Sequence, residues 1–161
     1  KAIVKKTLAL AKKYGKPVFG VVANMSIGLE RRDFLKELSA FVCNSQEAGL
    51  LFCTDFSGLT PEELADVISE KVIQARIPKL VVTVGSQGAV YADMDGDKGV
   101  CPARAVEVKD TTGAGDSFCA GLAVGLTYGK SLREASVIVT TENVCPRFLP
   151  RELGLDMDVA D

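Results

Sequence analysis

Residues 108–118 read Val-Lys-Asp-Thr-Thr-Gly-Ala-Gly-Asp-Ser-Phe, and this stretch indicates the chemistry of the chain. The order of residue types predicts the end of a strand, a glycine turn, and a helix with an acid in its first turn. Such a helix start presents unpaired backbone N–H groups and the positive end of the helix dipole. Gly113 and Gly115 have no Cβ that would keep a ligand from the backbone. The sequence therefore predicts an anion site here, typically one for phosphate.

Asp116 lies in the first turn of this predicted helix and has the chemistry needed for phosphoryl transfer. A carboxylate there can hold an attacking hydroxyl in line and accept its proton. The backbone N–H groups of residues 114–116 would stabilise the charge on the phosphoryl group. The alternative interpretation is structural, with a glycine turn followed by an aspartate that favours the helix dipole.

Strand-like and helix-like patterns alternate along the rest of the chain, which predicts an α/β fold. Strands are predicted at 17–23, 40–43 and 79–84, each apolar enough to be buried on both faces of a parallel sheet. A turn at 85–88 leads into a hairpin arm at 89–92, and short strands are predicted near 100–101 and 105–108. Helices are predicted at 29–38, 45–52, 61–75, 114–128 and 132–141, with an irregular tail after Pro146.

The chain opens with a predicted amphipathic helix, which places Ile3, Leu10 and Tyr14 on its apolar face and ends at Gly15. No capping residue precedes its first turn, and residue 1 is lysine. We expect a fragment whose natural N-terminus lies upstream. The alternative is a frayed first helix that follows a processed methionine.

The composition excludes several classes of protein. The chain has 161 residues, which favours one domain, and its 47% hydrophobic and 25% charged residues are ordinary for a globular protein. A net charge of −2 provides no basic excess for a phosphate backbone, so we expect no nucleic acid partner. The apolar runs are too short to cross a bilayer, and no secretory signal opens the chain, so no membrane partner is expected.

The five cysteines are odd in number and lack Cys-x-x-Cys spacing, and the chain has no histidine. This combination argues against a zinc site and against histidine-dependent catalysis. Reduced thiols in a cytoplasmic protein fit best. The acidic stretch 93–97 has its glycine at the fourth position instead of the sixth, so we interpret it as a solvated turn and not a calcium loop.

The stretch Asp110–Phe118 closely resembles the C-terminal signature of the PfkB (ribokinase-like) carbohydrate kinases. Two further segments resemble the family in order and spacing: Val42–Ala48, which contains an Asn-x-x-Glu element, and Val81–Ala89, a strand followed by a glycine turn. The resemblance covers about residues 1–145. It implies a ribokinase-like three-layer α/β/α sandwich, with a mostly parallel sheet and a C-terminal antiparallel hairpin. It also implies that residues 1–161 are a single nucleotide-binding domain, without the family's N-terminal substrate-binding and lid part.

The resemblance implies roles for individual residues. Asp116 is expected to be the catalytic base, and Gly113, Ala114 and Gly115 are expected to form the anion hole. Expected nucleotide contacts come from Asn44, Glu47, Thr83, Gly85, Ser86, Gly88 and Thr112, with Glu47 acting on Mg²⁺ through ordered water. The residues alone also permit a plainer interpretation, in which Asn44 and Glu47 form a capping box and Gly85 and Gly88 belong to an ordinary turn.

By this resemblance, the complete protein is expected to use ATP and Mg²⁺ to phosphorylate a hydroxyl of a sugar or related small molecule. The Gly-Ala pair that commonly helps enclose a monovalent cation in the family is missing from residues 140–146, which does not favour a K⁺ site near Asp110 and Thr112. Two alternatives stay open: a nucleoside kinase of the same family, of adenosine or pseudouridine type, and a non-catalytic nucleotide-binding fragment. The fragment alone is expected to be inactive and to form a homo-oligomer.

Two other nucleotide-binding classes are not supported by the motifs. A dinucleotide-binding oxidoreductase would carry an early strand–Gly-x-Gly-x-x-Gly–helix unit, and a Walker-type nucleotidase would carry Gly-Lys-Ser/Thr. The chain contains neither.

Overall fold

A five-stranded sheet forms the centre of the molecule. The computed structural model describes residues 2–21, 32–103 and 113–141. In the described part, the strands follow one another across the sheet in chain order, namely β1 (Phe19–Val21), β2 (Ala40–Asn44), β3 (Lys79–Thr83), β4 (Ala89–Asp93) and β5 (Lys98–Cys101). β1, β2 and β3 run parallel, and β3, β4 and β5 run antiparallel. The predicted parallel sheet with an antiparallel hairpin at its C-terminal end is confirmed.

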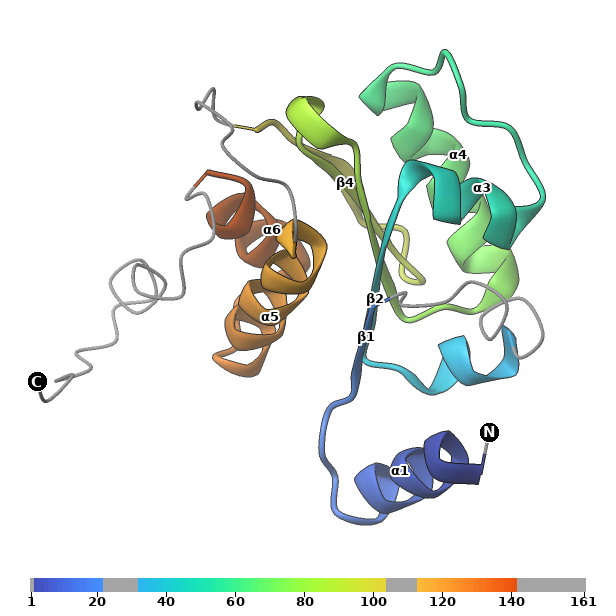
Figure 1. Ribbon diagram of the computed structural model, residues 1–161, viewed down its shortest axis with the longest axis vertical. Helices are drawn as coiled ribbons and strands as arrows, with labels where there is room; N and C mark the ends of the chain where they lie inside the picture. Colours follow the sequence, from blue (N-terminus) through green and yellow to red (C-terminus); the bar gives the residue numbers. More distant parts are fainter. Residues whose placement is uncertain (1, 22–31, 104–112, 142–161) are drawn as a thin grey trace, which may run out of the picture.

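Helices cover both faces of this sheet. They are α1 (Ala2–Lys13), α3 (Ser45–Phe52), α4 (Pro61–Ala75), α5 (Ala114–Thr127) and α6 (Leu132–Thr141), with 3-10 turns η1 (Arg32–Glu37) and η2 (Gly85–Gln87). α3 and α4 lie on one face, and α5 and α6 lie on the other (Figure 1). This is the predicted three-layer α/β/α sandwich.

The two faces of the central strands enter two separate hydrophobic cores. Phe41 of β2 and Leu80 of β3 pack in the core that includes Ile68 of α4. Their neighbours Val42 and Val81 pack in the opposite core, which includes Leu122 of α5. Since successive strand residues point to opposite faces, a strand covered on both sides must be apolar throughout. The prediction that β2 and β3 are buried on both faces is confirmed.

The same prediction was wrong for β1. The predicted strand 17–23 is a strand only at Phe19–Val21 within the described residues, and Val21 keeps 38% of its surface exposed. Residues 22 and 23 lie outside the described part of the chain. β1 is the edge strand of the described sheet and pairs there with β2 alone, so no described strand pairs with its outer side.

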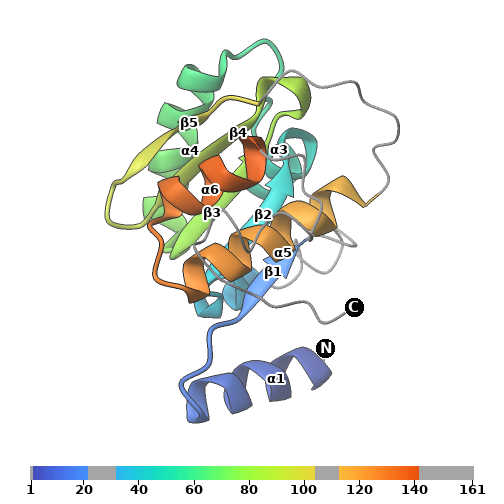
Figure 2. The same ribbon diagram turned by 90° about the vertical axis from the view of Figure 1, so that its left-hand side faces the viewer.

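The predicted amphipathic helix at the start of the chain is present as α1, and its apolar face is largely exposed. Ile3, Leu10 and Tyr14 of the predicted apolar face are exposed, and the buried residue is Leu8. α1 lies beyond the end of the sheet, where little of the described chain packs against it (Figure 2). The end of the helix is as predicted, because Gly15 has a left-handed φ of +59° that favours glycine.

Local signals predicted the other helices well. Thr60 and Glu63 exchange hydrogen bonds at the start of α4, and Ser131 and Glu134 do so at the start of α6. The predicted helix 29–38 is the shorter η1 where it is described. The predicted strand 105–108 and the tail lie outside the described residues. Among the helices of the described ranges, none has the length and apolar character needed to cross a membrane.

Candidate active site

One end of the sheet gathers the segments that carry the predicted site residues. Asn44 closes β2 and Thr83 closes β3, and the two residues are register partners. The N-terminus of α5 and the η2 turn lie at this same end of the molecule (Figures 1 and 2). In open α/β sheets, ligands bind beyond the carboxyl ends of parallel strands. The fold therefore places the predicted site where such sheets bind their ligands.

The N-terminus of α5 is open and built on glycine. Gly113 occupies the N-cap position with a left-handed φ of +76°, and its carbonyl accepts the Ser117 N–H at 2.9 Å. Within the described residues, no side chain caps this end and no atom lies within 4 Å of a Cβ built on Gly113 or Gly115. Ala114, Gly115 and Asp116 are exposed. With respect to the described residues, the space over this helix start is therefore open, and the helix dipole would favour an anion there.

Asp116 extends from the first turn of α5 into solvent. Its carboxylate is close enough to the thiol of Cys119 to affect it: burial raises the pKa of Cys119, and the negative charge of Asp116 raises it further. An exposed carboxylate beside an open helix N-terminus can hold a hydroxyl against a bound phosphate. The arrangement thus places the Asp116 carboxylate next to the predicted anion site.

Asn44 and Glu47 form a reciprocal capping box at the start of α3. The Glu47 carboxylate accepts the Asn44 N–H at 2.8 Å, and the Asn44 side-chain oxygen accepts the Glu47 N–H at 2.9 Å. The capping box that the residues alone permitted is thus present. It is compatible with the predicted nucleotide contact, because the start of α3 lies at the same end of the sheet as the predicted site. Burial, followed by the charge of Glu47, raises the pKa of the neighbouring Cys43 thiol far above its usual range.

In the glycine turn after β3, some of the residues predicted to contact the nucleotide are exposed. Gly85 and Ser86 lie exposed in η2, and a Cβ on Gly85 would meet nothing within 4 Å. Thr83 is half-buried, and its hydroxyl donates to the Cys43 carbonyl at 3.5 Å. Thr112 and Asp110 lie outside the described residues. Gly85, Ser86 and Thr83 are therefore the described residues of this segment that a nucleotide can approach.

Gly88 is placed differently from what the sequence suggested. It is buried, its N–H donates to the Gly85 carbonyl at 3.1 Å, and its carbonyl accepts the Val84 N–H at 2.9 Å. The side of its Cα that would carry a Cβ faces the backbone of Cys101 and Ala103. Sequence reasoning missed this contact, because a glycine in a turn does not indicate which distant segment lies against it.

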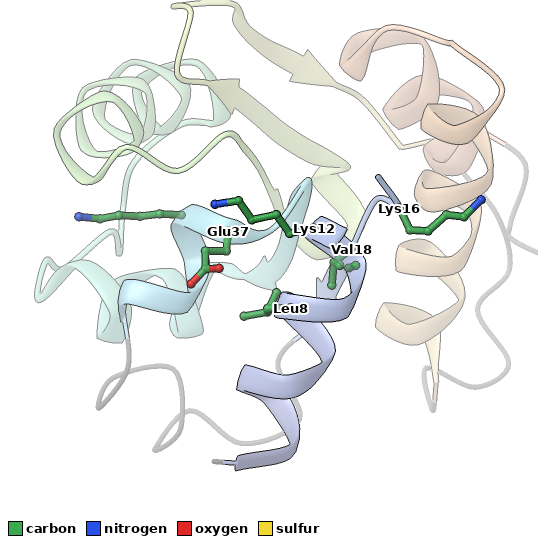
Figure 3. A pocket seen from close by; sticks show the side chains of 7 residues that line it. Leu8, Lys12, Lys16, Val18 and Glu37 are labelled. Atoms are coloured by element: carbon green, nitrogen blue, oxygen red, sulfur yellow. The ribbon is translucent and has the colours of Figure 1, made fainter. Parts of the chain in front are cut away.

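One hollow of the described chain lies away from the predicted site. A hollow of about 320 Å³ between α1 and η1 is lined by Leu8, Val18, Lys12, Lys16 and Glu37, among others. Lys12 and Lys16 point in opposite directions and do not converge on one point (Figure 3). The hollow also lies at the end of the molecule opposite the N-terminus of α5.

Residues 1–139 match the family model described as pfkB family carbohydrate kinase. The chain belongs to this family. A guanosine-inosine kinase of Exiguobacterium acetylicum is 34% identical over 151 residues, a match that covers 88% of this chain and 49% of that protein. The family's kinases also share the fold, which confirms the ribokinase-like expectation.

Two solved structures illustrate this likeness. An adenosine kinase from Sinorhizobium meliloti has a TM-score of 0.69 and 26% identity, with 86% of this chain and 41% of that one covered. An Arabidopsis thaliana ribokinase complexed with ribose and ATP has a TM-score of 0.72 and 23% identity, with 96% and 53% covered. The chain therefore spans about half the length of the family members that it matches.

Proposed function

We propose that this chain is the nucleotide-binding part of an ATP-dependent kinase that phosphorylates a hydroxyl of a sugar or a nucleoside. The observation that carries the proposal is the open, glycine-built N-terminus of α5, with Asp116 in its first turn, at the carboxyl ends of the parallel strands. Membership of the pfkB family supports phosphoryl transfer as the reaction class.

In this proposal Asp116 is the general base. It accepts the proton of the acceptor hydroxyl while that oxygen forms a bond to the terminal phosphorus of ATP. The bond from this phosphorus to the bridging oxygen breaks, and ADP leaves with the electron pair. The backbone N–H groups at Gly113, Ala114 and Gly115 stabilise the negative charge on the phosphoryl oxygens as it is transferred.

Magnesium is the metal we propose for this site. Among the described residues, no three His, Cys, Asp or Glu side chains form a cluster that could hold a metal by themselves. Mg²⁺ keeps several waters and is commonly bound through substrate phosphates, so it does not require such a cluster. Glu47, held by its cap with Asn44, is the carboxylate that we assign to the water shell of the metal. The metal would neutralise charge on the phosphates.

We propose that the acceptor site and its lid belong to a further part of the kinase fold. The family members have about twice the length that this chain matches. We propose that this part docks on the outer edge of β1 and on the exposed apolar residues Ile3, Leu10, Tyr14 and Val21. Exposed sheet edges and apolar patches of this kind are usually covered by another segment.

A nucleoside acceptor is the second candidate. It is favoured by the 34% identity with a guanosine-inosine kinase, whereas the family description names carbohydrate kinases. A panel of ribose, other sugars and purine nucleosides, assayed by ADP release in a polypeptide that contains both parts of the fold, distinguishes the two acceptor classes.

The function is tested with Asp116→Asn, which keeps the size of the side chain and removes its ability to accept a proton. General-base loss lowers the rate by about 10²–10⁴-fold, while the affinity for Mg·ADP should change little. Asp95→Asn, at an exposed position of the β4–β5 turn, is the matched control and should retain full rate. A rate for Asp116→Asn equal to that of the unaltered enzyme would show that Asp116 only stabilises the helix start.

A non-catalytic nucleotide-binding module gives a different result in the same assay. It would bind Mg·ADP, as measured by isothermal titration calorimetry, and would transfer phosphate to no acceptor of the panel even with both parts of the fold present.

A further inference from the structure

Gly88 has a backbone conformation and a contact that only glycine permits. Its φ of +105° and ψ of −129° lie in a region that side chains rarely adopt. A Cβ at this position would lie 2.0 Å from the carbonyl oxygen of Cys101 and 2.6 Å from the backbone nitrogen of Ala103. Both are backbone atoms, which cannot move aside as the end of a flexible side chain can. The end of β5 therefore lies directly across the Gly88 Cα.

This contact connects two sides of the proposed nucleotide site. Gly88 directly follows η2, which presents Gly85 and Ser86 to solvent. Cys101 is fully buried and packs in the same core as Phe118 and Cys119, in the first two turns of α5. The Cys101 thiol also donates to the Arg133 carbonyl of α6 at 4.0 Å, and α6 packs against α5, so the packed core connects the η2 turn, through Cys101 and α6, with the helix that carries the proposed anion site.

Gly88 is buried, and both of its backbone polar groups have partners within the protein. Its N–H is bonded to the Gly85 carbonyl, and its carbonyl is bonded to the Val84 N–H. Its missing side chain leaves room for protein backbone and not for a ligand. Any effect of Gly88 on the site must act through the segment that it contacts.

We propose that Gly88 is a positioning residue, whose missing side chain sets the separation between the η2 turn and the N-terminus of α5. This separation lets one nucleotide contact Gly85 and Ser86 on one side and Gly113–Asp116 on the other. The inference rests on the proposed nucleotide-binding function and deepens it. Any side chain at position 88 pushes the end of β5 outward, and the first turns of α5 move with Cys101 because interiors are close-packed.

The test compares Gly88→Ala with Gly96→Ala. Gly96 has a similar positive φ of +94°, but a Cβ there meets nothing within 4 Å. Both variants carry backbone strain, so both should unfold at a lower temperature than the unaltered chain. Only Gly88→Ala should weaken Mg·ADP binding, by tenfold or more in calorimetry. Only Gly88→Ala should also shift the amide NMR signals of Gly115 and Asp116 in the nucleotide-free chain.

A second variant keeps the test decisive if Gly88→Ala does not fold. Pro102→Gly leaves Gly88 unchanged and removes the proline ring that restricts the backbone of the segment lying across it. The carbonyl carbon of Pro102 lies 2.8 Å from a Cβ built on Gly88. We expect a folded chain with several-fold weaker Mg·ADP binding. Unchanged Mg·ADP affinity in Pro102→Gly would overturn the inference.

The outcomes separate this inference from the function on which it rests. If Gly88→Ala binds Mg·ADP as tightly as Gly96→Ala and leaves the α5 amide signals in place, Gly88 has no positioning role and the nucleotide site stands. If the unaltered chain binds no Mg·ADP at millimolar concentration, the nucleotide site and the inference both fail.

Discussion

Asn44 and Glu47 each accept the other's backbone N–H, at 2.9 and 2.8 Å, where β2 ends and α3 begins. Thr60 and Glu63 make the same pair of bonds at the start of α4. The first cap lies at the proposed nucleotide site, and the second begins a helix that contributes no residue to it. The chain thus contains a matched control for the role of Glu47.

Glu47→Ala and Glu63→Ala should reduce the free energy of unfolding by similar amounts, about 1 kcal/mol each, because each variant loses one capping hydrogen bond. Only Glu47→Ala should weaken the binding of Mg·ADP relative to ADP without the metal. Urea titration measures the first effect, and calorimetry with and without Mg²⁺ measures the second. Equal metal dependence in the two variants would leave Glu47 with its capping role alone.

Gly115→Ala should separate folding from binding, with effects of opposite sign. Alanine favours a helix over glycine by up to about 1 kcal/mol, and nothing lies within 4 Å of its Cβ, so the free energy of unfolding should stay the same or rise. The affinity for Mg·ADP should fall, because the methyl group keeps the phosphate from the backbone. Thermal melting and calorimetry on one sample check both parts. Tighter or unchanged ADP binding would contradict the anion hole.

Gly113→Ala should lower the free energy of unfolding, in contrast to Gly115→Ala. Its φ of +76° is left-handed, and an alanine there is destabilising by about 1–2 kcal/mol. The melting temperature should therefore fall for Gly113→Ala and not for Gly115→Ala. Similar melting temperatures for these two variants would contradict the N-cap geometry of α5.

The thiols should differ in reactivity with their burial. Cys53 is exposed, whereas Cys43, Cys101 and Cys119 are buried. Burial raises the pKa of Cys101 to about 11, so this thiol stays protonated at pH 8 while the chain is folded. Among these four described thiols, iodoacetamide at pH 8 should label Cys53 first and the buried three only after denaturant is added, as peptide masses will show. Early labelling of Cys101 would contradict its position in the core.

The raised thiol pKa values also predict how stability depends on pH. A thiol that ionises near pH 9 when unfolded and near pH 11 when folded stabilises the folded state fully below pH 9, and this contribution is lost as the pH rises toward 11. The urea midpoint should therefore fall between pH 9 and 11, and the fall should be smaller in Cys101→Ala. An equal fall in both chains would assign it to other groups.

The free edge of β1 and the exposed face of α1 should make this chain self-associate. Light scattering should show a mass that rises with concentration, because apolar residues and unpaired strand groups are available to a second copy. Replacing Val21 and Leu10 with lysine should shift the chain toward monomer. A monodisperse monomer at high concentration would contradict the exposure of this surface.

The helices could be predicted from sequence because their signals are local. Thr60, Pro61 and Glu63 mark the start of α4 within four positions of one another, and the structure begins the helix at Pro61. The start of α5 could be predicted in the same way from the glycine turn before it, where Gly113 is the N-cap. Capping and turn chemistry depend on a few neighbouring residues, so the sequence contains the information.

Burial at the chain's first elements could not be predicted in this way. The apolar face of α1 is exposed, and Val21 of β1 lies at a sheet edge, because burial depends on what packs opposite and not on the residue itself. The contact of Gly88 with Cys101 was unpredictable for the same reason. The sequence gives the position of a glycine in a turn, but it does not identify the distant segment whose backbone contacts that glycine.

The order of the strands has a consequence for the synthesis of this chain and for its transfer between genes. Since β1 to β5 are laid down side by side in the sequence in which they are synthesised, no strand from elsewhere is interleaved among those described. Each strand can add to the one made just before it as the polypeptide leaves the ribosome. The antiparallel pairs β3–β4 and β4–β5 join neighbouring segments and are fast to form, whereas the parallel pairs β1–β2 and β2–β3 need long connections and form more slowly. A gene break or a recombination event placed before β1 would therefore transfer the whole block without disrupting any strand pair within it.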